Sequence, residues 1–280
     1  MSERVAVVTG ANRGIGKAIA QGIARADFRT VLVCRRREDG ERAMEEIASR
    51  TGRHALEVMT ADLSSLAEVR RLGDELLARF PAVHVLVNNA AVASRQRRES
   101  VDGIEMTLAV NHLAHFELTR RLLPALERGA PSRVVTVSSG AHQGQKLVFD
   151  DLQNVRRLYR GVRVYGETKL MNVLFTRELA RRTAGTGVVA NCCHPGVIAT
   201  RLMLDYLPAL LRPLVGAMAG TPERGADTAV WLATSPEVAG ATGGYYIGRR
   251  PARTNPLADD AELARRLWTE SELLTARPAA

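Results

Sequence analysis

Two residues with complementary chemistry, Tyr165 and Lys169, stand four positions apart at the start of an apolar-periodic run that predicts a helix. Residues four apart share one face of a helix, so we expect the phenol and the ammonium to be neighbours. A fixed cation lowers the pKa of a phenol, and moving it from about 10 to about 7 takes roughly 4 kcal/mol. Such a tyrosine could exchange protons near neutral pH. A half-buried tyrosine beside a solvated lysine is the alternative.

The use of lysine favours the chemical interpretation. Only three lysines, Lys17, Lys146 and Lys169, occur among the 39 basic residues. An ammonium is a compact point charge, whereas a guanidinium is broad and planar. A lysine at position 169 therefore indicates a site that needs this kind of charge.

The composition is that of an ordinary folded chain of 280 residues with a net charge of +9. No dense basic run with interleaved aromatic residues occurs, so we expect solvated arginines rather than nucleic-acid binding. The three cysteines include an adjacent pair without metal-ligand spacing, which predicts no metal site and a reducing, cytoplasmic environment. The charged residues 1–4 argue against a signal peptide, and no apolar run reaches the length of a membrane span.

A glycine-rich turn follows the first predicted strand, residues 4–9. It reads TGANRGIG over residues 9–16 and leads into a helical pattern. Glycines let the backbone approach a pyrophosphate, and the first turn of a helix offers free N–H groups. The spacing G-x-x-x-G-x-G differs from the dinucleotide fingerprint G-x-G-x-x-G, and an ordinary tight turn is the alternative.

The end of the second predicted strand, residues 30–34, indicates which dinucleotide would bind. A carboxylate there would hold the adenosine ribose of NAD, but this strand leads into Arg35, Arg36 and Arg37. Together with Arg13 in the turn, these cations suit the additional phosphate of NADP. The alternative is that the arginines simply face water.

Further strands are predicted at 54–60, 83–87, 133–137, 188–194 and 243–247. Asp62 follows the first of these and either caps a turn or binds the adenine edge of a cofactor. Asn89 and Ala90 follow the second, where small residues suit the ligand crevice of a parallel sheet. Ser139 follows the third, 26 residues before the tyrosine.

A long helix is predicted over 103–127, with Asn111 in its interior. Asparagine competes for backbone groups inside a helix, so it is either tolerated at the surface or used. His112 and His115 have no acidic or cysteine partner at metal-ligand spacing, and we interpret them as helix-surface or packing residues.

The alternation of strands and helices predicts a single-domain α/β fold: a Rossmann-type, doubly wound parallel sheet of about seven strands with helices on both faces. Residues 1–135 would mainly bind the cofactor, and residues 136–250 would carry the catalytic and substrate half. Within it, the apolar but broken segment 197–221 is expected to cover an apolar pocket, or less plausibly to lie on a membrane surface. Residues 251–280 form a tail with helical character.

These motifs together resemble the classical short-chain dehydrogenases/reductases. The turn at 9–16 looks like their T-G-x-x-x-G-x-G motif, residues 88–90 like their N-N-A segment, and Tyr165 with Lys169 like their Y-x-x-x-K pair. Residues 110–116 also look like the retinol dehydrogenase and WW-domain oxidoreductase branch, as do segments 149–152, 174–179 and 266–268. That branch often has an N-terminal membrane anchor.

The resemblance implies a catalytic set and a cofactor site. The catalytic residues would be Asn111, Ser139, Tyr165 and Lys169. The cofactor would contact Gly10, Asn12, Arg13, Gly14, Ile15, Gly16, Arg35, Arg36, Asp62, Leu63, Asn89, Ala90, Tyr165, Lys169, Pro195, Gly196, Val197 and Thr200. Ala91 stands where the family usually has glycine, and Thr168 where serine is common.

The predicted function is NADP(H)-dependent hydride transfer to or from a bulky hydrophobic carbonyl or alcohol, with NAD(H) the less favoured cofactor. A tailoring reductase of secondary metabolism, acting on an aromatic polyketide ketone or quinone, is one alternative. A non-catalytic, cofactor-binding regulatory protein is another, because fold does not fix function. The resemblance also implies a homodimer or tetramer paired through two long helices.

Overall fold

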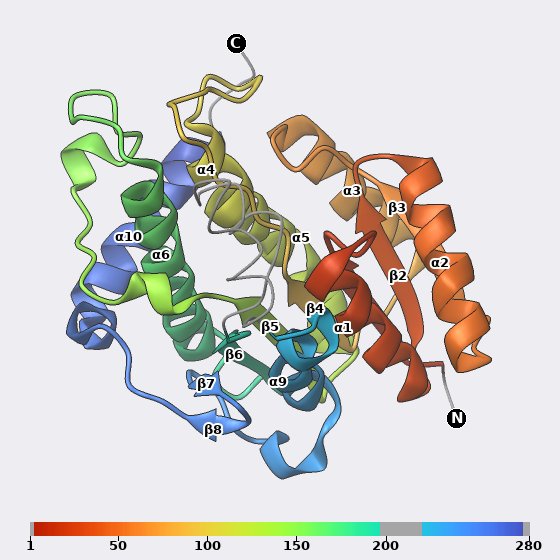
Figure 1. The fold of residues 1–280 in the computed structure, drawn as a ribbon. Helices are drawn as coiled ribbons and strands as arrows, with labels where there is room; N and C mark the ends of the chain where they lie inside the picture. The colour runs from red at the N-terminus through yellow and green to blue at the C-terminus, as the bar shows by residue number, and fades with distance from the viewer. Residues whose placement is uncertain (1–2, 197–219, 277–280) are drawn as a thin grey trace.

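The computed structural model describes residues 3–196 and 220–276, and the predicted cover lies almost wholly outside these ranges. One sheet organises the described chain (Figure 1). Its strands are β1 Val5–Thr9, β2 Arg29–Cys34, β3 Leu56–Thr60, β4 Val85–Asn88, β5 Ser132–Val137, β6 Val188–His194, β7 Tyr245–Ile247 and β8 Arg250–Pro251.

The strand order is β3-β2-β1-β4-β5-β6-β7-β8, and every pairing is parallel except that of β7 with β8. The chain turns outward from β1 in both directions, which confirms the predicted doubly wound sheet. The sequence predicted about seven strands, and the structure has eight. β8 escaped prediction because two residues carry no alternating pattern; Gly248 and Arg249, both with positive φ, form the tight turn that folds it back.

Helices cover both faces of the sheet. They are α1 Gly14–Arg25, α2 Arg37–Thr51, α3 Leu66–Arg79, α4 Met106–Leu108, the π-helical turn η1 Ala109–Leu113, α5 Ala114–Arg128, α6 Gly161–Arg182, α9 Pro222–Thr234 and α10 Ala261–Ala276. Short 3₁₀ turns are η2 Gly140–His142, η3 Phe149–Asp151, η5 Pro236–Val238 and η6 Pro256–Asp259. None of the helices in these described ranges is long and apolar enough to cross a membrane.

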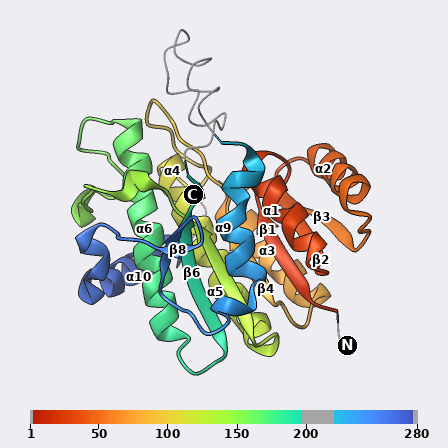
Figure 2. The same ribbon diagram turned by 60° about the horizontal axis from the view of Figure 1, so that its bottom comes forward.

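The two helical layers bury separate apolar clusters. Helices α1, α2 and α9 pack on one face, and α3, α5 and α6 pack on the other (Figure 2). The first cluster includes Ile19 and Ile23 of α1 and Leu32 of β2. Strands β1, β2 and β4 contribute side chains to both clusters, so they are buried on both faces. This explains their continuous apolar runs, which are typical of parallel sheets.

The helix predicted over 103–127 is interrupted. It starts at Met106, because the carboxylate of Glu105 accepts hydrogen bonds from the backbone N–H groups of Thr107 and Leu108 at 2.9 and 2.7 Å. The π-helical turn η1 then places Asn111 in the middle of the break before α5 begins. Asn111 is buried in this break, so of the two sequence-based interpretations, tolerated at the surface or used, the second holds.

The tail forms helix α10, which packs against α6 and η1. Trp268 lies 4.9 Å from Phe116 of α5 between ring centroids and stacks on Phe175 of α6 at 5.9 Å. The ring of His112 is buried beneath this helix and is hydrogen-bonded to Ser271 at 2.8 Å. Helix α10 is thus part of the core on the α5–α6 side of the sheet.

Candidate active site

The four candidate catalytic side chains come from three parts of the chain that meet beyond the carboxyl ends of the central strands. Ser139 follows β5 and precedes η2, Tyr165 and Lys169 lie in α6, and Asn111 lies in η1. Serine and tyrosine, distant in sequence, meet because α6 packs directly over η2 and β5. This is the crevice where open α/β sheets bind their ligands.

The hydroxyl group of Ser139 lies near that of Tyr165 and acts to lower the pKa of the phenol. The Ser139 oxygen also accepts from the N–H of Ala141 at 3.2 Å, which orients the serine toward the phenol. Burial raises the pKa of Tyr165 to about 12, and the Ser139 hydroxyl offsets only part of this rise. The protein groups alone therefore keep the phenol protonated, and the lowered pKa expected from the sequence is not found.

Lys169 is 1% exposed, and its Nζ donates to the carbonyl oxygen of Val137 at 2.9 Å. Its Nζ lies 5.4 Å from the centroid of the Tyr165 ring, so the predicted neighbours do meet. Burial lowers the pKa of Lys169 to about 8. The hydroxyl of Ser138 donates to the carbonyl oxygen of Lys169 at 2.9 Å, fixing this turn of α6 to the end of β5.

The side chain of Asn111 is fully engaged by protein groups. Its Oδ1 accepts from the N–H of Val92 at 2.8 Å, and its Nδ2 donates to the Val92 carbonyl at 2.9 Å. The Nδ2 group also donates to the hydroxyl of Thr168 at 3.2 Å. The side chain thus fixes the loop after β4 and ties η1 to α6, while the main-chain carbonyl of Asn111 lies 3.1 Å from the ring of His115.

The glycine-rich turn is shaped for close approach. A Cβ on Gly16 would lie 2.1 Å from the carbonyl oxygen of Gly10 and 2.4 Å from Nδ2 of Asn89, so only glycine fits. Gly10 and Gly14 have φ of 65° and 55°, the left-handed region that glycine adopts readily. No side chain caps the start of α1, and its first turn has no acidic residue. The N–H groups there can therefore receive an anion.

The predicted phosphate-binding arginines lie beside this turn. Arg13 and Arg35 are exposed and make no ion pair with any residue of the described ranges. Arg36 is also exposed and has only long contacts with Glu38 and Asp39, at 3.7 and 3.9 Å. The residues present thus fit a dinucleotide that carries an additional phosphate.

The other predicted cofactor contacts fall into three groups. One oxygen of Asp62 accepts from the N–H and hydroxyl of Ser64 at 2.9 and 2.7 Å, so this carboxylate caps its own turn and keeps its second oxygen for a ligand. Asn12, Ile15, Leu63, Ala90, Pro195 and Gly196 are partly exposed around the same crevice, as are Asn89 and Gly10. Val197 and Thr200 lie outside the described residues.

Two residues of this region were missed by the sequence analysis. The hydroxyl of Thr9 accepts from the N–H groups of Asn89 and Ala90 at 2.9 and 3.0 Å, tying the end of β1 to the end of β4. His115 is 1% exposed and contacts both Thr9 and the Asn111 carbonyl. Of the two sequence-based interpretations of His115, surface or packing, its burial therefore supports packing. Its position four residues after Asn111 was the available signal.

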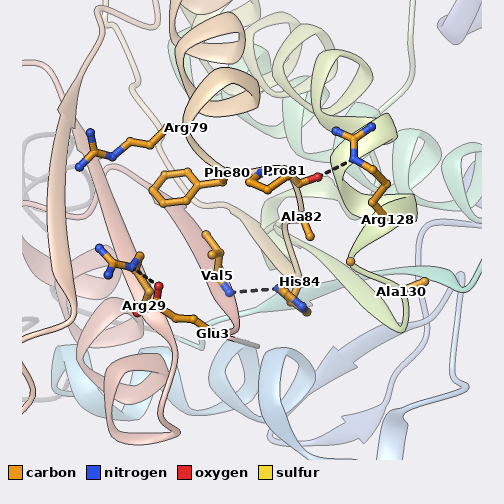
Figure 3. Close-up of a pocket in the computed structure, with 11 residues that line it drawn as sticks. Glu3, Val5, Arg29, Arg79, Phe80, Pro81, Ala82, His84, Arg128 and Ala130 are labelled. Carbon is orange, nitrogen blue, oxygen red and sulfur yellow. Dashed lines mark hydrogen bonds and ion pairs between the residues drawn. The ribbon is translucent and has the colours of Figure 1, made fainter. Parts of the chain in front are cut away.

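A surface pocket of about 600 Å³ lies at the opposite edge of the sheet, among the amino ends of β1, β2 and β4 (Figure 3). Its polar groups already have partners: Arg29 pairs with Glu3 at 2.6 Å, and Nδ1 of His84 accepts from the N–H of Val5 at 3.0 Å. No candidate catalytic residue lines it, so size alone does not mark the candidate active site.

Comparisons with known proteins agree with this geometry. The family model for short chain dehydrogenases matches residues 4–208. Human retinol dehydrogenase 14 is 38% identical over 292 residues, covering 98% of this chain and 87% of that protein. A crystal structure of an uncharacterised protein from Mycobacterium paratuberculosis has a TM-score of 0.79 at 33% identity, covering 100% and 96% of the two chains.

A complex of Pseudomonas aeruginosa RhlG with NADP at its active site is also similar, with a TM-score of 0.69 and 29% identity over 88% of this chain and 94% of that one. The matching residues 4–208 include the glycine-rich turn and all four candidate catalytic residues. The chain belongs to the short-chain dehydrogenase family of oxidoreductases, in the branch of the retinol dehydrogenases.

Proposed function

We propose that this protein transfers hydride between NADP(H) and a hydrophobic carbonyl or alcohol. The observation that carries the proposal is the meeting of Ser139, Tyr165 and Lys169 at the same end of the sheet as a helix start and exposed arginines that have no capping or ion-pair partner among the described residues. The cofactor, when bound, supplies or accepts the hydride. The chain's own residues hold the substrate oxygen and move its proton.

In the direction of reduction, Tyr165 donates its phenolic proton to the substrate oxygen. The raised pKa of this phenol keeps the donor loaded throughout the neutral range. Ser139 donates a hydrogen bond to the same oxygen and stabilises the negative charge that develops there. Lys169 holds the nicotinamide ribose and favours the phenolate once the proton has left. The carbonyl of Asn111 holds a water between Lys169 and the solvent.

Replacing Tyr165 with phenylalanine tests the proton donor. We expect Tyr165→Phe to lower kcat by at least about 100-fold, because general acid catalysis contributes that much or more. NADPH binding, measured by fluorescence titration, should change little, because the ring and its packing remain. Near-normal turnover of the variant would remove Tyr165 from this role.

The cofactor preference tests the arginines. We expect wild-type kcat/KM to favour NADPH over NADH, and Arg35→Ala to reduce that preference about tenfold through loss of a charge-assisted hydrogen bond to the phosphate. Arg53→Ala is a matched control, because Arg53 is an exposed arginine paired with Asp27 beyond the far end of α2. A wild-type preference for NADH would contradict the assignment of NADP.

The substrate class rests on two supports. The segment 197–221 is rich in leucine, methionine and alanine, and the names of similar curated proteins include retinol dehydrogenases 12, 13 and 14. A panel of hydrophobic aldehydes and ketones, compared with small polar carbonyls of equal reactivity, tests this class. Faster turnover of the polar compounds would overturn it, and no turnover of any carbonyl would favour a cofactor-binding regulatory protein.

A further inference from the structure

His115 is a buried histidine in the first turn of α5 that touches both halves of the candidate active site. Its Nδ1 lies 3.1 Å from the carbonyl oxygen of Asn111, and its Nε2 lies 3.3 Å from the hydroxyl oxygen of Thr9. Asn111 belongs to the catalytic set, whereas Thr9 joins the ends of β1 and β4 beside the glycine-rich turn. One ring therefore spans the two groups of residues.

The partners decide where the ring carries its proton. A carbonyl oxygen only accepts hydrogen bonds, so Nδ1 must carry hydrogen and donate to Asn111. Nε2 is then an acceptor and receives the hydroxyl proton of Thr9. The Thr9 oxygen keeps its lone pairs for the N–H groups of Asn89 and Ala90. The carbonyl of Val87, 3.2 Å from the same hydroxyl, is the competing acceptor.

The ring must also stay neutral, because Nε2 would otherwise become a donor and lose the Thr9 proton. Burial, reinforced by the nearby Lys169 cation, lowers the pKa of His115 to about 3. Besides Lys169, the only other titratable group acting on the ring within the described chain is His112, whose pKa burial lowers to about 4. Both histidines therefore stay neutral near pH 7.

We propose that His115 is a positioning residue that holds the Asn111 carbonyl and the cofactor-binding strand ends in register. The inference rests on the proposed function, which it deepens. The Nδ1–H group occupies one of the two lone pairs of the carbonyl and leaves the other for the water that the proposed function places between Lys169 and the solvent. The Nε2 acceptor fixes the Thr9 hydroxyl and, through it, the backbone of Asn89 and Ala90.

Two amide substitutions distinguish the hydrogen bond to Asn111 from the hydrogen bond to Thr9. In His115→Asn the amide nitrogen replaces Nδ1 and keeps the bond to Asn111, but nothing reaches Thr9. In His115→Gln the amide reaches the place of Nε2 and keeps the bond to Thr9, but the Nδ1 donor is lost. We expect the first variant to raise the Kd for NADPH about fivefold to tenfold with kcat nearly unchanged, since one net hydrogen bond contributes about 1 kcal/mol.

The second variant should show the reverse pattern. We expect His115→Gln to bind NADPH normally, while kcat falls about tenfold and the alkaline limb of its pH profile moves, because the Asn111 carbonyl proposed to hold the water linked to Lys169 is no longer fixed. His112→Asn is the matched control: His112 is equally buried but is bound to Ser271. It should lower the Tm and leave kcat, Kd and the pH profile unchanged.

A purely structural role would change the two His115 variants alike, or change only the Tm, and either result overturns the proposal. ¹⁵N NMR of protein labelled at histidine reports the tautomer of His115 and does not depend on enzymatic activity. The His115 ring should be the neutral Nδ1–H tautomer and should not titrate between pH 5 and 9. An Nε2–H tautomer refutes the arrangement. If no carbonyl substrate is found, the proposed function fails alone, and the Kd and NMR measurements still decide the role of His115.

Discussion

Lys169 carries its ammonium group inside the protein. Its chain is 1% exposed, and its only hydrogen bond to the described residues is to the Val137 carbonyl. The lowered pKa shows that holding this charge opposes folding. Catalytic sites commonly carry such shifts, because the groups that do chemistry are placed where packing alone would not put them. The sequence predicted the tyrosine–lysine contact but not its burial, which depends on the whole of α6.

This burial gives stability a pH dependence with a definite sign. Between about pH 8 and 10.5 the unfolded chain binds a proton at Lys169 that the folded chain has lost, so stability rises with pH in this window. Relative to Lys169→Met, the wild-type free energy of unfolding should gain about 2 kcal/mol from pH 7 to 9.5.

Urea denaturation of both proteins at the two pH values measures this gain. Lys17→Met serves as the control, because Lys17 is partly exposed and paired with Glu46 on the surface. Equal changes for both variants, or a wild-type loss on raising the pH, would contradict the buried cation.

At the scale of elements, the C-terminal helix α10 anchors the helices that bear the site. Trp268 packs on Phe116 and Phe175, and its indole N–H donates to Glu272 at 3.0 Å. The guanidinium of Arg182 lies 4.3 Å from the Trp268 ring centroid. Because Phe175 and Arg182 belong to α6, these contacts support the helix that carries Tyr165.

Removing this indole should therefore cost more than surface packing does. We expect Trp268→Ala to lower the free energy of unfolding by about 3–5 kcal/mol, as for other buried tryptophans. Leu273→Ala, on the same helix but 58% exposed, should change it by less than about 0.5 kcal/mol. Circular dichroism during urea denaturation reports both, and equal losses would mean that α10 contributes only its helical propensity.

At the scale of the whole molecule, the sequence was sufficient for the order of the main strands and helices. Strand β6 has the predicted bounds, and β1 and β2 differ by one residue at one end. These strands are continuous apolar runs bounded by polar turns, which is the strongest local signal for a buried strand. Ser139 was placed at this edge of the sheet because it follows a predicted parallel strand, whereas Tyr165 and Lys169 were placed on one face of a helix by their spacing.

The remaining features depend on contacts between segments far apart in the chain. In the π-helical turn, Asn111 is hydrogen-bonded to Val92 in the loop after β4. The ring of His112 is hydrogen-bonded to Ser271 of α10, 159 residues further along the chain. The pKa of Tyr165 is likewise set by packing rather than by its lysine neighbour. The order of apolar and polar residues in a short stretch of sequence does not reveal such long-range contacts.

The sheet ends in a strand of two residues. β8 runs antiparallel to β7, and its second residue, Pro251, has no backbone N–H to offer a neighbour. Another polypeptide strand that approached β8 would find too few backbone N–H and C=O groups without partners to continue the hydrogen-bonding pattern of the sheet. The hairpin of β7 and β8 thus protects this edge of the sheet, and copies of the protein at high concentration are not expected to aggregate by pairing strands there.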